Sequence, residues 1–270
     1  MEPKKTSFKP IVHTYTRNPV VKKKVTPGVA NSHPPAATKR IVYPSYVRNL
    51  VYDFDDVYYI SLERRPDRRE AFLKRIDSMS WPFKEPKWFK AIDANDVPAP
   101  ATWKELKPAY AASLSHLAVC KKALDENKTF LILEDDVIFV DNFATKVKEF
   151  LANVPANWDC LMIGGCHCEK YLPKIAPNVS RCTWTVCLHC YVVRGDMLKQ
   201  FVSMNPPTSP TDQMLASLMK RYKVYSPEPL LAGQSTDFSD IERGMRNESF
   251  TGFNRNVKGI TARGSNAPHQ

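Results

Sequence analysis

The sequence contains no apolar run of the roughly 18 residues that a membrane-spanning helix requires. Its first residues are polar and basic, and they lack the apolar segment of a secretory signal. Glycine is scarce, with 9 residues in 270, and neither common glycine-rich phosphate loop occurs. These absences argue against a membrane protein, against standard export and against the usual nucleotide-binding loops. We therefore expect a cytoplasmic protein.

Acidic residues are almost absent from residues 1–49, which hold ten Lys or Arg and one Glu and so carry a charge of +9. Residues 50–270 hold 29 Lys or Arg and 27 Asp or Glu, a net charge of +2. Seven prolines and few large apolar residues predict that residues 1–49 form a flexible segment outside the fold. We expect one domain over residues 50–245 and a polar tail over residues 246–270.

The basic run Lys22, Lys23 and Lys24 is of the kind that makes weak contacts with nucleic acid, an anionic membrane or a partner protein. A solvated linker is the alternative that we favour, because charge runs are weak signals. The near-neutral charge of residues 50–270 argues against a nucleic-acid-binding protein, which normally carries a basic face.

The seven cysteines are an odd number, and six of them are close in sequence: Cys160, Cys166, Cys168, Cys182, Cys187 and Cys190. In a protein without a secretory signal we expect reduced thiols. A structural zinc site made by Cys166-x-Cys168 and Cys187-x-x-Cys190 is an alternative, although the first spacing is shorter than zinc sites usually have. Small cysteines also serve as ordinary core residues.

Strand and helix patterns alternate along the chain. Apolar and β-branched runs predict strands, and apolar residues spaced by three and four predict helices. The expected strands cover residues 57–62, 87–92, 130–133, 158–163, 183–193 and 223–225, and the expected helices begin at Pro66 and cover residues 108–127, 141–152, 195–202 and 211–222. This order predicts an α/β domain with a Rossmann-like, mainly parallel sheet that helices cover on both faces.

Three consecutive acids, Glu134, Asp135 and Asp136, follow the apolar run 130–133. Like charges repel one another, and burial raises the cost further. A divalent cation offsets that cost, and Mg²⁺ or Mn²⁺ is commonly held by one or two carboxylates together with phosphate oxygens. Ligands of open sheets bind beyond the carboxyl ends of the strands, so this strand end is a candidate metal and diphosphate site. A solvated acidic turn is the alternative.

Arginines follow the first expected strand, at positions 64, 65 and 68. Forked guanidinium donors suit phosphate oxygens, so we expect at least one of Arg64, Arg65 and Arg68 to face a nucleotide. A plain surface charge is the alternative for each of them.

Several segments follow one another in a distinctive order. They are residues 59–68 (YISLERRPDR), 91–94 (AIDA), 113–118 (SLSHLA), 133–137 (LEDDV), 158–164 (WDCLMIG), 191–193 (YVV), 210–212 (PTD) and 229–234 (PLLAGQ). In this order and spacing they resemble glycosyltransferase family 25, which includes lipopolysaccharide-type β-galactosyltransferases and procollagen galactosyltransferases.

The resemblance implies a glycosyltransferase A-type fold. It also implies transfer of a hexose, galactose or glucose, from a UDP-sugar to a hydroxyl of a glycan or protein acceptor, with inversion. The implied cofactor is Mn²⁺ or Mg²⁺, bound by Asp136 together with Glu134 or Asp135, with the remaining acid on the ribose. The implied nucleotide-sugar contacts are Leu62, Arg64, Arg65, Arg68, Asp93, Ser115, His116 and Asp135. A cytoplasmic enzyme of this kind would suit a bacterial or viral source.

Asp212 is the candidate base for the acceptor hydroxyl, since the family places an acid before a helix here, and a helix N-cap is the alternative. Tyr191 and Gln234 would line the acceptor side or simply pack. His116 is alternatively a structural histidine, and Asp93 a turn cap. Two other functions stay open: a non-catalytic relative that binds a partner, and a zinc-dependent nucleic-acid binder.

Overall fold

The computed structural model describes residues 54–169, 171–235, 238–239 and 244–245. The expected flexible segment 1–49 and the expected tail 246–270 lie outside the described residues. Among the helices that the structure describes, none has both the length and the apolar character needed to cross a membrane.

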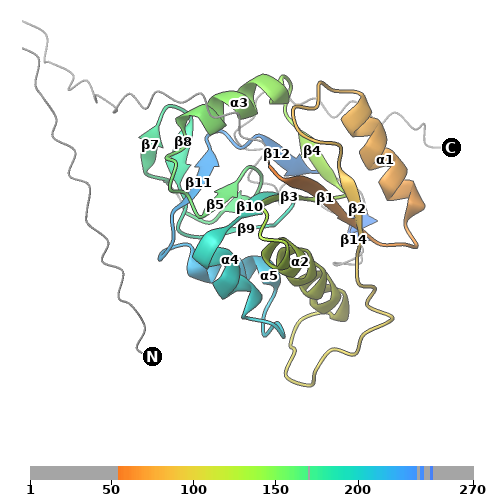
Figure 1. Cartoon of the computed structure of the whole chain (residues 1–270). Helices are drawn as coiled ribbons and strands as arrows, with labels where there is room; N and C mark the ends of the chain where they lie inside the picture. The colour runs from red at the N-terminus through yellow and green to blue at the C-terminus, as the bar shows by residue number, and fades with distance from the viewer. Residues whose placement is uncertain (1–53, 170, 236–237, 240–243, 246–270) are drawn as a thin grey trace, which may run out of the picture. The chain divides into compact units, whose positions relative to one another are not determined.

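An eight-stranded sheet forms the centre of the described structure, in the order β2-β1-β3-β10-β5-β11-β8-β7 (Figure 1). β1 is parallel to β2 and β3, and β10 is antiparallel to β3 and β5. β11 is parallel to β5 and antiparallel to β8, which is antiparallel to β7. Six strands therefore run in one direction, and β10 and β8 run in the other. The strands are β1 (Asp56–Ser61), β2 (Lys87–Lys90), β3 (Phe130–Glu134), β5 (Cys160–Met162), β7 (Lys174–Ala176), β8 (Val179–Arg181), β10 (Cys190–Val193) and β11 (Val224–Pro227).

Helices cover both faces of this sheet (Figure 1). One face carries α1 (Pro66–Asp77) and α3 (Phe143–Asn153), and the other carries α2 (Lys107–Asp125), α4 (Gly195–Val202) and α5 (Thr211–Leu218). Side chains alternate along β1, so that Val57 and Tyr59 join the core under α1 and α3, while Tyr58 and Ile60 join the core under the other three helices. The predicted α/β fold, with a mainly parallel sheet covered on both faces, is confirmed.

The carboxyl ends of β1 and β3 lie side by side, because these strands pair in parallel with Ile60 opposite Glu134. β1 leads into α1, where Pro66 occupies the first turn and its fixed φ favours helix initiation. β3 leads through the acidic turn into β4 (Val137–Phe139). The two chain segments expected at strand ends therefore meet at one edge of the sheet.

Three short strand pairs were not expected from the sequence. β4 pairs with β12 (Ala232–Gln234), β6 (Cys166–His167) with β9 (Thr185–Val186), and β13 (Phe238–Ser239) with β14 (Gly244–Met245). The segment 183–193, whose pattern predicts one or two strands, contains β9 and β10. Cys187, between them, has a φ of 64°, in the left-handed region, which interrupts an extended strand.

Candidate functional site

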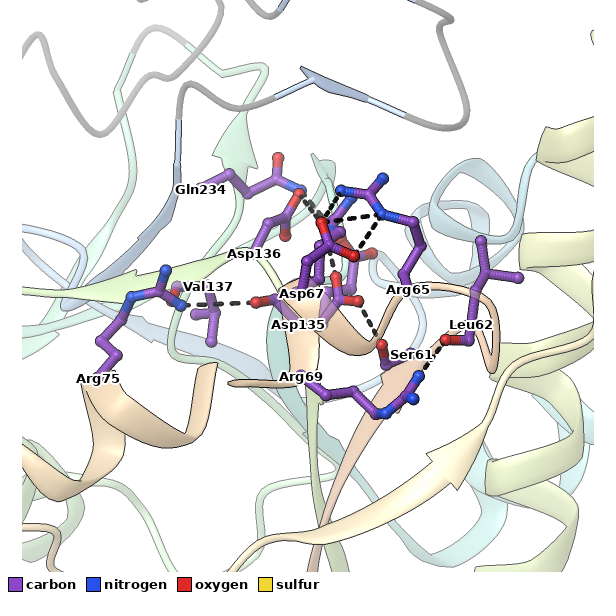
Figure 2. A network of polar contacts seen from close by, with 12 residues as sticks. Ser61, Leu62, Arg65, Asp67, Arg69, Arg75, Asp135, Asp136, Val137 and Gln234 are labelled. Atoms are coloured by element: carbon purple, nitrogen blue, oxygen red, sulfur yellow. Dashed lines mark hydrogen bonds and ion pairs between the residues drawn. The ribbon is translucent and has the colours of Figure 1, made fainter. Parts of the chain in front are cut away.

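The acidic turn after β3 is buried and contacts Arg68 from the first turn of α1. Asp135 and Asp136 are each 8% exposed. Nη2 of Arg68 lies 2.5 Å from Oδ1 of Asp135 and 3.2 Å from Oδ2 of Asp136. Ser61, the last residue of β1, donates a hydrogen bond of 2.6 Å to Oδ2 of Asp135 (Figure 2). Three segments that are separate in sequence, β1, α1 and the β3–β4 turn, therefore form one polar centre.

The electrostatics of this centre favour a cation. Burial raises the pKa of Asp135 from its ordinary 3.8 to about 6; Arg68 and Ser61 oppose that rise, and the charges of Asp136 and Glu134 add to it. A bound cation would offset the charges of Asp136 and Glu134, which raise the pKa of Asp135.

The donor chemistry of the centre fits a hard divalent cation, because carboxylate oxygens are the ligands that Mg²⁺ and Mn²⁺ prefer. Within the part of the chain that the structure describes, no three His, Cys, Asp or Glu side chains gather as a ready-made metal cage. Asp135 and Asp136 share Arg68 and would supply one or two ligands. The remaining ligands would have to come from a diphosphate or water.

Glu134 belongs to a buried polar chain of side chains. Its Oε1 lies 3.2 Å from Nε2 of His116, and its Oε2 accepts a hydrogen bond of 2.8 Å from Gln234. Nδ1 of His116 lies 3.1 Å from the hydroxyl of Tyr191. A His116 tautomer with its proton on Nε2 donates to Glu134 and accepts from Tyr191, so this chain fixes the Glu134 carboxylate.

Tyr191, expected on the acceptor side or in the packing, lies in the core with no exposed surface. Burial raises the pKa of its hydroxyl well above the usual range, so the hydroxyl keeps its proton. Its side chain therefore packs in the core, as the alternative has it, and a fully buried ring leaves no surface for an acceptor. Gln234, 7% exposed, reaches Glu134 because β12 pairs with β4.

The predicted arginines have different partners. Arg64 Nε lies 2.6 Å from Oδ2 of Asp93, Arg65 pairs with Asp67 at 2.7 Å, and Arg68 contacts the acidic turn. Figure 2 shows the Arg65–Asp67 pair beside the Asp135 carboxylate.

Two residues of this centre were missed by the sequence analysis, Ser61 and Arg75. Nη1 of Arg75 donates to the carbonyl oxygen of Val137 at 2.7 Å and lies 3.5 Å from that of Asp135 (Figure 2). Arg75 follows Arg68 by seven residues, which puts both on one face of a helix. That spacing was a usable signal for Arg75.

Other predicted contacts hold the surrounding backbone. Ser115 is fully buried; its Oγ donates to the Ala111 carbonyl and accepts from the Ile92 amide, each at 2.8 Å. Oδ1 of Asp93 accepts a hydrogen bond of 2.9 Å from the Asn95 amide, so Asp93 caps the turn, which was the alternative expected for it. The carbonyl oxygen of Leu62 accepts a hydrogen bond from Arg69. Ser115 therefore joins α2 to the chain after β2 and is too buried to face a nucleotide.

Asp212 lies in the first turn of α5 and contacts the loop between β9 and β10. Its Oδ2 accepts a hydrogen bond of 3.1 Å from the amide of Cys187, and its Oδ1 accepts one of 2.8 Å from Gln213. The same loop reaches the acidic turn, because the Glu134 amide donates to the carbonyl of His189 at 3.1 Å. The segment 187–189 therefore links the candidate base to the acidic centre.

All seven cysteines are free thiols in the described part of the chain. Cys120, Cys160, Cys182 and Cys190 are buried, Cys168 is exposed, and Cys166 and Cys187 are half-buried.

Residues 54–186 match the sequence profile of "Glycosyltransferase family 25 (LPS biosynthesis protein)". "Procollagen galactosyltransferase 2" of Homo sapiens is 27% identical over 251 residues, which cover 74% of this chain and 39% of that protein. "Procollagen lysyl hydroxylase and glycosyltransferase" of Acanthamoeba polyphaga mimivirus is 27% identical over 205 residues, or 65% of this chain and 22% of that protein.

A third relative, "Inactive glycosyltransferase 25 family member 3" of Homo sapiens, is 27% identical over 140 residues, covering 41% of this chain and 22% of that protein. The chain thus spans well under half the length of the curated relatives that it matches.

Proposed function

We propose that this chain, whose residues 54–186 match the profile of glycosyltransferase family 25, transfers a hexose from a UDP-sugar to a hydroxyl of a glycan or protein acceptor. The observation that carries the proposal is the buried acidic turn against Arg68, at the carboxyl ends of β1 and β3. Two relatives are named as procollagen galactosyltransferases, which supports galactose ahead of glucose as the transferred sugar.

Asp135 and Asp136 would hold Mn²⁺ or Mg²⁺ in this proposal, with Glu134 as the neighbouring charge. The ion would neutralise negative charge on the departing diphosphate. Ser61 and Arg68 orient the Asp135 carboxylate through the 2.6 Å and 2.5 Å contacts. Because the pKa of Asp135 is about 6, we expect activity to fall as the pH drops below that value, where the protonated carboxyl is a poor ligand.

Asp212 would accept the proton of the acceptor hydroxyl, which attacks with inversion. Its carboxylate is half-buried and held by the Cys187 amide, so it is oriented before an acceptor arrives. Replacing Asp212 by asparagine keeps the shape but removes the basicity. We expect transfer to slow by about 10²–10⁴-fold while UDP affinity is unchanged. An equal loss of UDP binding would contradict a role confined to the base.

Calorimetric titration of UDP into the full chain, with and without Mn²⁺, tests the proposed donor site. We expect Mn²⁺ to strengthen binding of UDP, and Asp136→Asn to remove that dependence. Asp141→Asn is the matched control, since Asp141 is an exposed acid five residues along the chain. UDP binding that is absent, or unchanged by Mn²⁺, would contradict the proposal.

A non-catalytic relative that binds a partner is the second candidate function. The observation in its favour is that some relatives of this chain are named as inactive family members. Metal-dependent UDP binding without turnover of any UDP-sugar would favour it. The viral relative is consistent with the bacterial or viral source that we expect.

A further inference from the structure

Two thiols meet beside Asp212, where β6 and β9 pair. In this antiparallel pair Cys166 lies opposite Val186, and Cys187 follows directly. Successive residues of a regular strand point to opposite faces, which would turn Cys187 away from Cys166. The positive φ of Cys187 breaks that alternation. As a result the thiol of Cys187 hydrogen bonds with the thiol of Cys166.

The proton distribution of this pair is unequal. The hydrogen bond with Cys166 raises the pKa of Cys187 far above the usual range, and burial and the charges of Asp212 and Glu134 raise it further. Cys187 therefore keeps its proton and donates it toward Cys166. Attack on an oxidant requires a thiolate, and a Cys166 thiolate would accept the hydrogen bond that the Cys187 thiol donates.

Partial exposure separates this pair from the four buried cysteines and from the exposed Cys168. Cys166 and Cys187 are both half-buried, so that a small oxidant can reach them, whereas Cys120, Cys160, Cys182 and Cys190 are buried. Cys168 is exposed but lies two residues from Cys166, and its own Sγ contacts the Cys166 carbonyl oxygen at 3.8 Å. Cys168, directly after β6, is therefore a control thiol.

We propose that Cys166 and Cys187 are a redox modification site, at which a peroxide converts the two thiols into an intrachain disulfide. The Cys166 thiolate attacks one peroxide oxygen to give a sulfenic acid, and the peroxide leaves as hydroxide, which takes up a proton to form water. The Cys187 sulfur then displaces the sulfenic oxygen, which leaves as a second water. Two thiols are oxidised, and one hydrogen peroxide is reduced to two waters.

The bridge would tie the β9–β10 loop to β6 at the residue whose amide holds Asp212. The site goes beyond the proposed glycosyl transfer and does not depend on it, because the disulfide is detected chemically in the full chain whether or not the chain turns over a donor.

Peptide mapping after hydrogen peroxide treatment tests the pair. Trypsin releases residues 149–170 and 182–194, with three cysteines in each, so fragment spectra must assign the bridge. We expect one linked peptide that joins Cys166 to Cys187, lost on reduction with dithiothreitol. It should be absent from Cys166→Ser and Cys187→Ser and retained in Cys168→Ser.

The proposal is overturned if the linked peptide joins Cys168 instead. It is equally overturned if Cys168 gains oxygen at peroxide concentrations that leave Cys166 and Cys187 unlinked. Both of these outcomes are measured on the native chain, so the test does not depend on whether the serine variants fold.

Discussion

Replacing Asp135 by asparagine should raise the stability of the fold at neutral pH relative to its stability in acid. The pKa of Asp135 is raised from 3.8 to about 6 by burial, so the folded state binds the proton more tightly than the unfolded state. Ionisation of Asp135 therefore costs the folded state free energy. That cost is absent below the unfolded pKa, grows as the pH rises from about 4 to about 6, and is complete above it.

The magnitude follows from the shift of about two pKa units. At about 1.4 kcal/mol per unit, the native chain loses about 3 kcal/mol of unfolding free energy across that range. Asparagine carries no charge, so the variant does not lose this unfolding free energy as the pH rises. Urea unfolding without divalent cations, at about pH 4 and about pH 7.5, gives the stability difference between variant and native chain at each pH. We expect the difference to favour the variant by about 2–3 kcal/mol more at the higher pH.

Any steric effect of the substitution is the same at both pH values, so it cancels when the two stability differences are compared. Asp67→Asn is the control of opposite sign, because its pairing with Arg65 lowers the pKa of Asp67 to about 2. Asp67 is largely exposed, so its loss should cost at most about 1 kcal/mol at neutral pH. An Asp135→Asn variant whose stability changes equally at both pH values would refute the argument that Asp135 is a strained, buried charge.

Two further substitutions test the core around the site by thermal or urea unfolding. Tyr191→Phe removes the hydroxyl that pairs with Nδ1 of buried His116, and should lower the free energy of unfolding by about 1–3 kcal/mol. An unchanged free energy of unfolding would show that this contact does not stabilise the fold. Gly164→Ala would place a Cβ 2.5 Å from Nε2 of His189, and should cost about 3 kcal/mol. Gly195→Ala, with φ at 61° and open space around it, should cost about 1 kcal/mol, and equal losses at the two glycines would argue against the clash.

The sequence analysis succeeded where a pattern is local. The helix expected over residues 108–127 is α2 (Lys107–Asp125), and the one over residues 195–202 matches α4 to the residue. The adjacency of the two strand ends followed from the parallel order of β1 and β3. The first result rests on local hydrophobic periodicity, and the second on the rule that the carboxyl ends of parallel strands lie at one edge of a sheet.

Contacts between distant segments could not be read from the sequence. Gln234 reaches Glu134 because β12 pairs with β4 across about a hundred residues, and neither three-residue strand has a pattern of its own. The pairing of Cys166 with Cys187 depends on one left-handed residue, which no propensity marks at a cysteine. Tyr191 was expected to line the acceptor side or to pack, and a strand pattern alone does not tell how deeply a residue of a covered sheet is buried.

Nucleotide release from a panel of sugar nucleotides, with and without Mn²⁺, tests the central claim most directly. The comparison uses the native chain, Asp136→Ala and the exposed control Asp141→Ala. The proposal predicts Mn²⁺-dependent hydrolysis of one UDP-sugar by the native chain and the control, and its loss in Asp136→Ala. Absence of turnover of every donor, together with no metal-dependent donor binding, would contradict the assignment of an enzyme and leave the partner-binding relative.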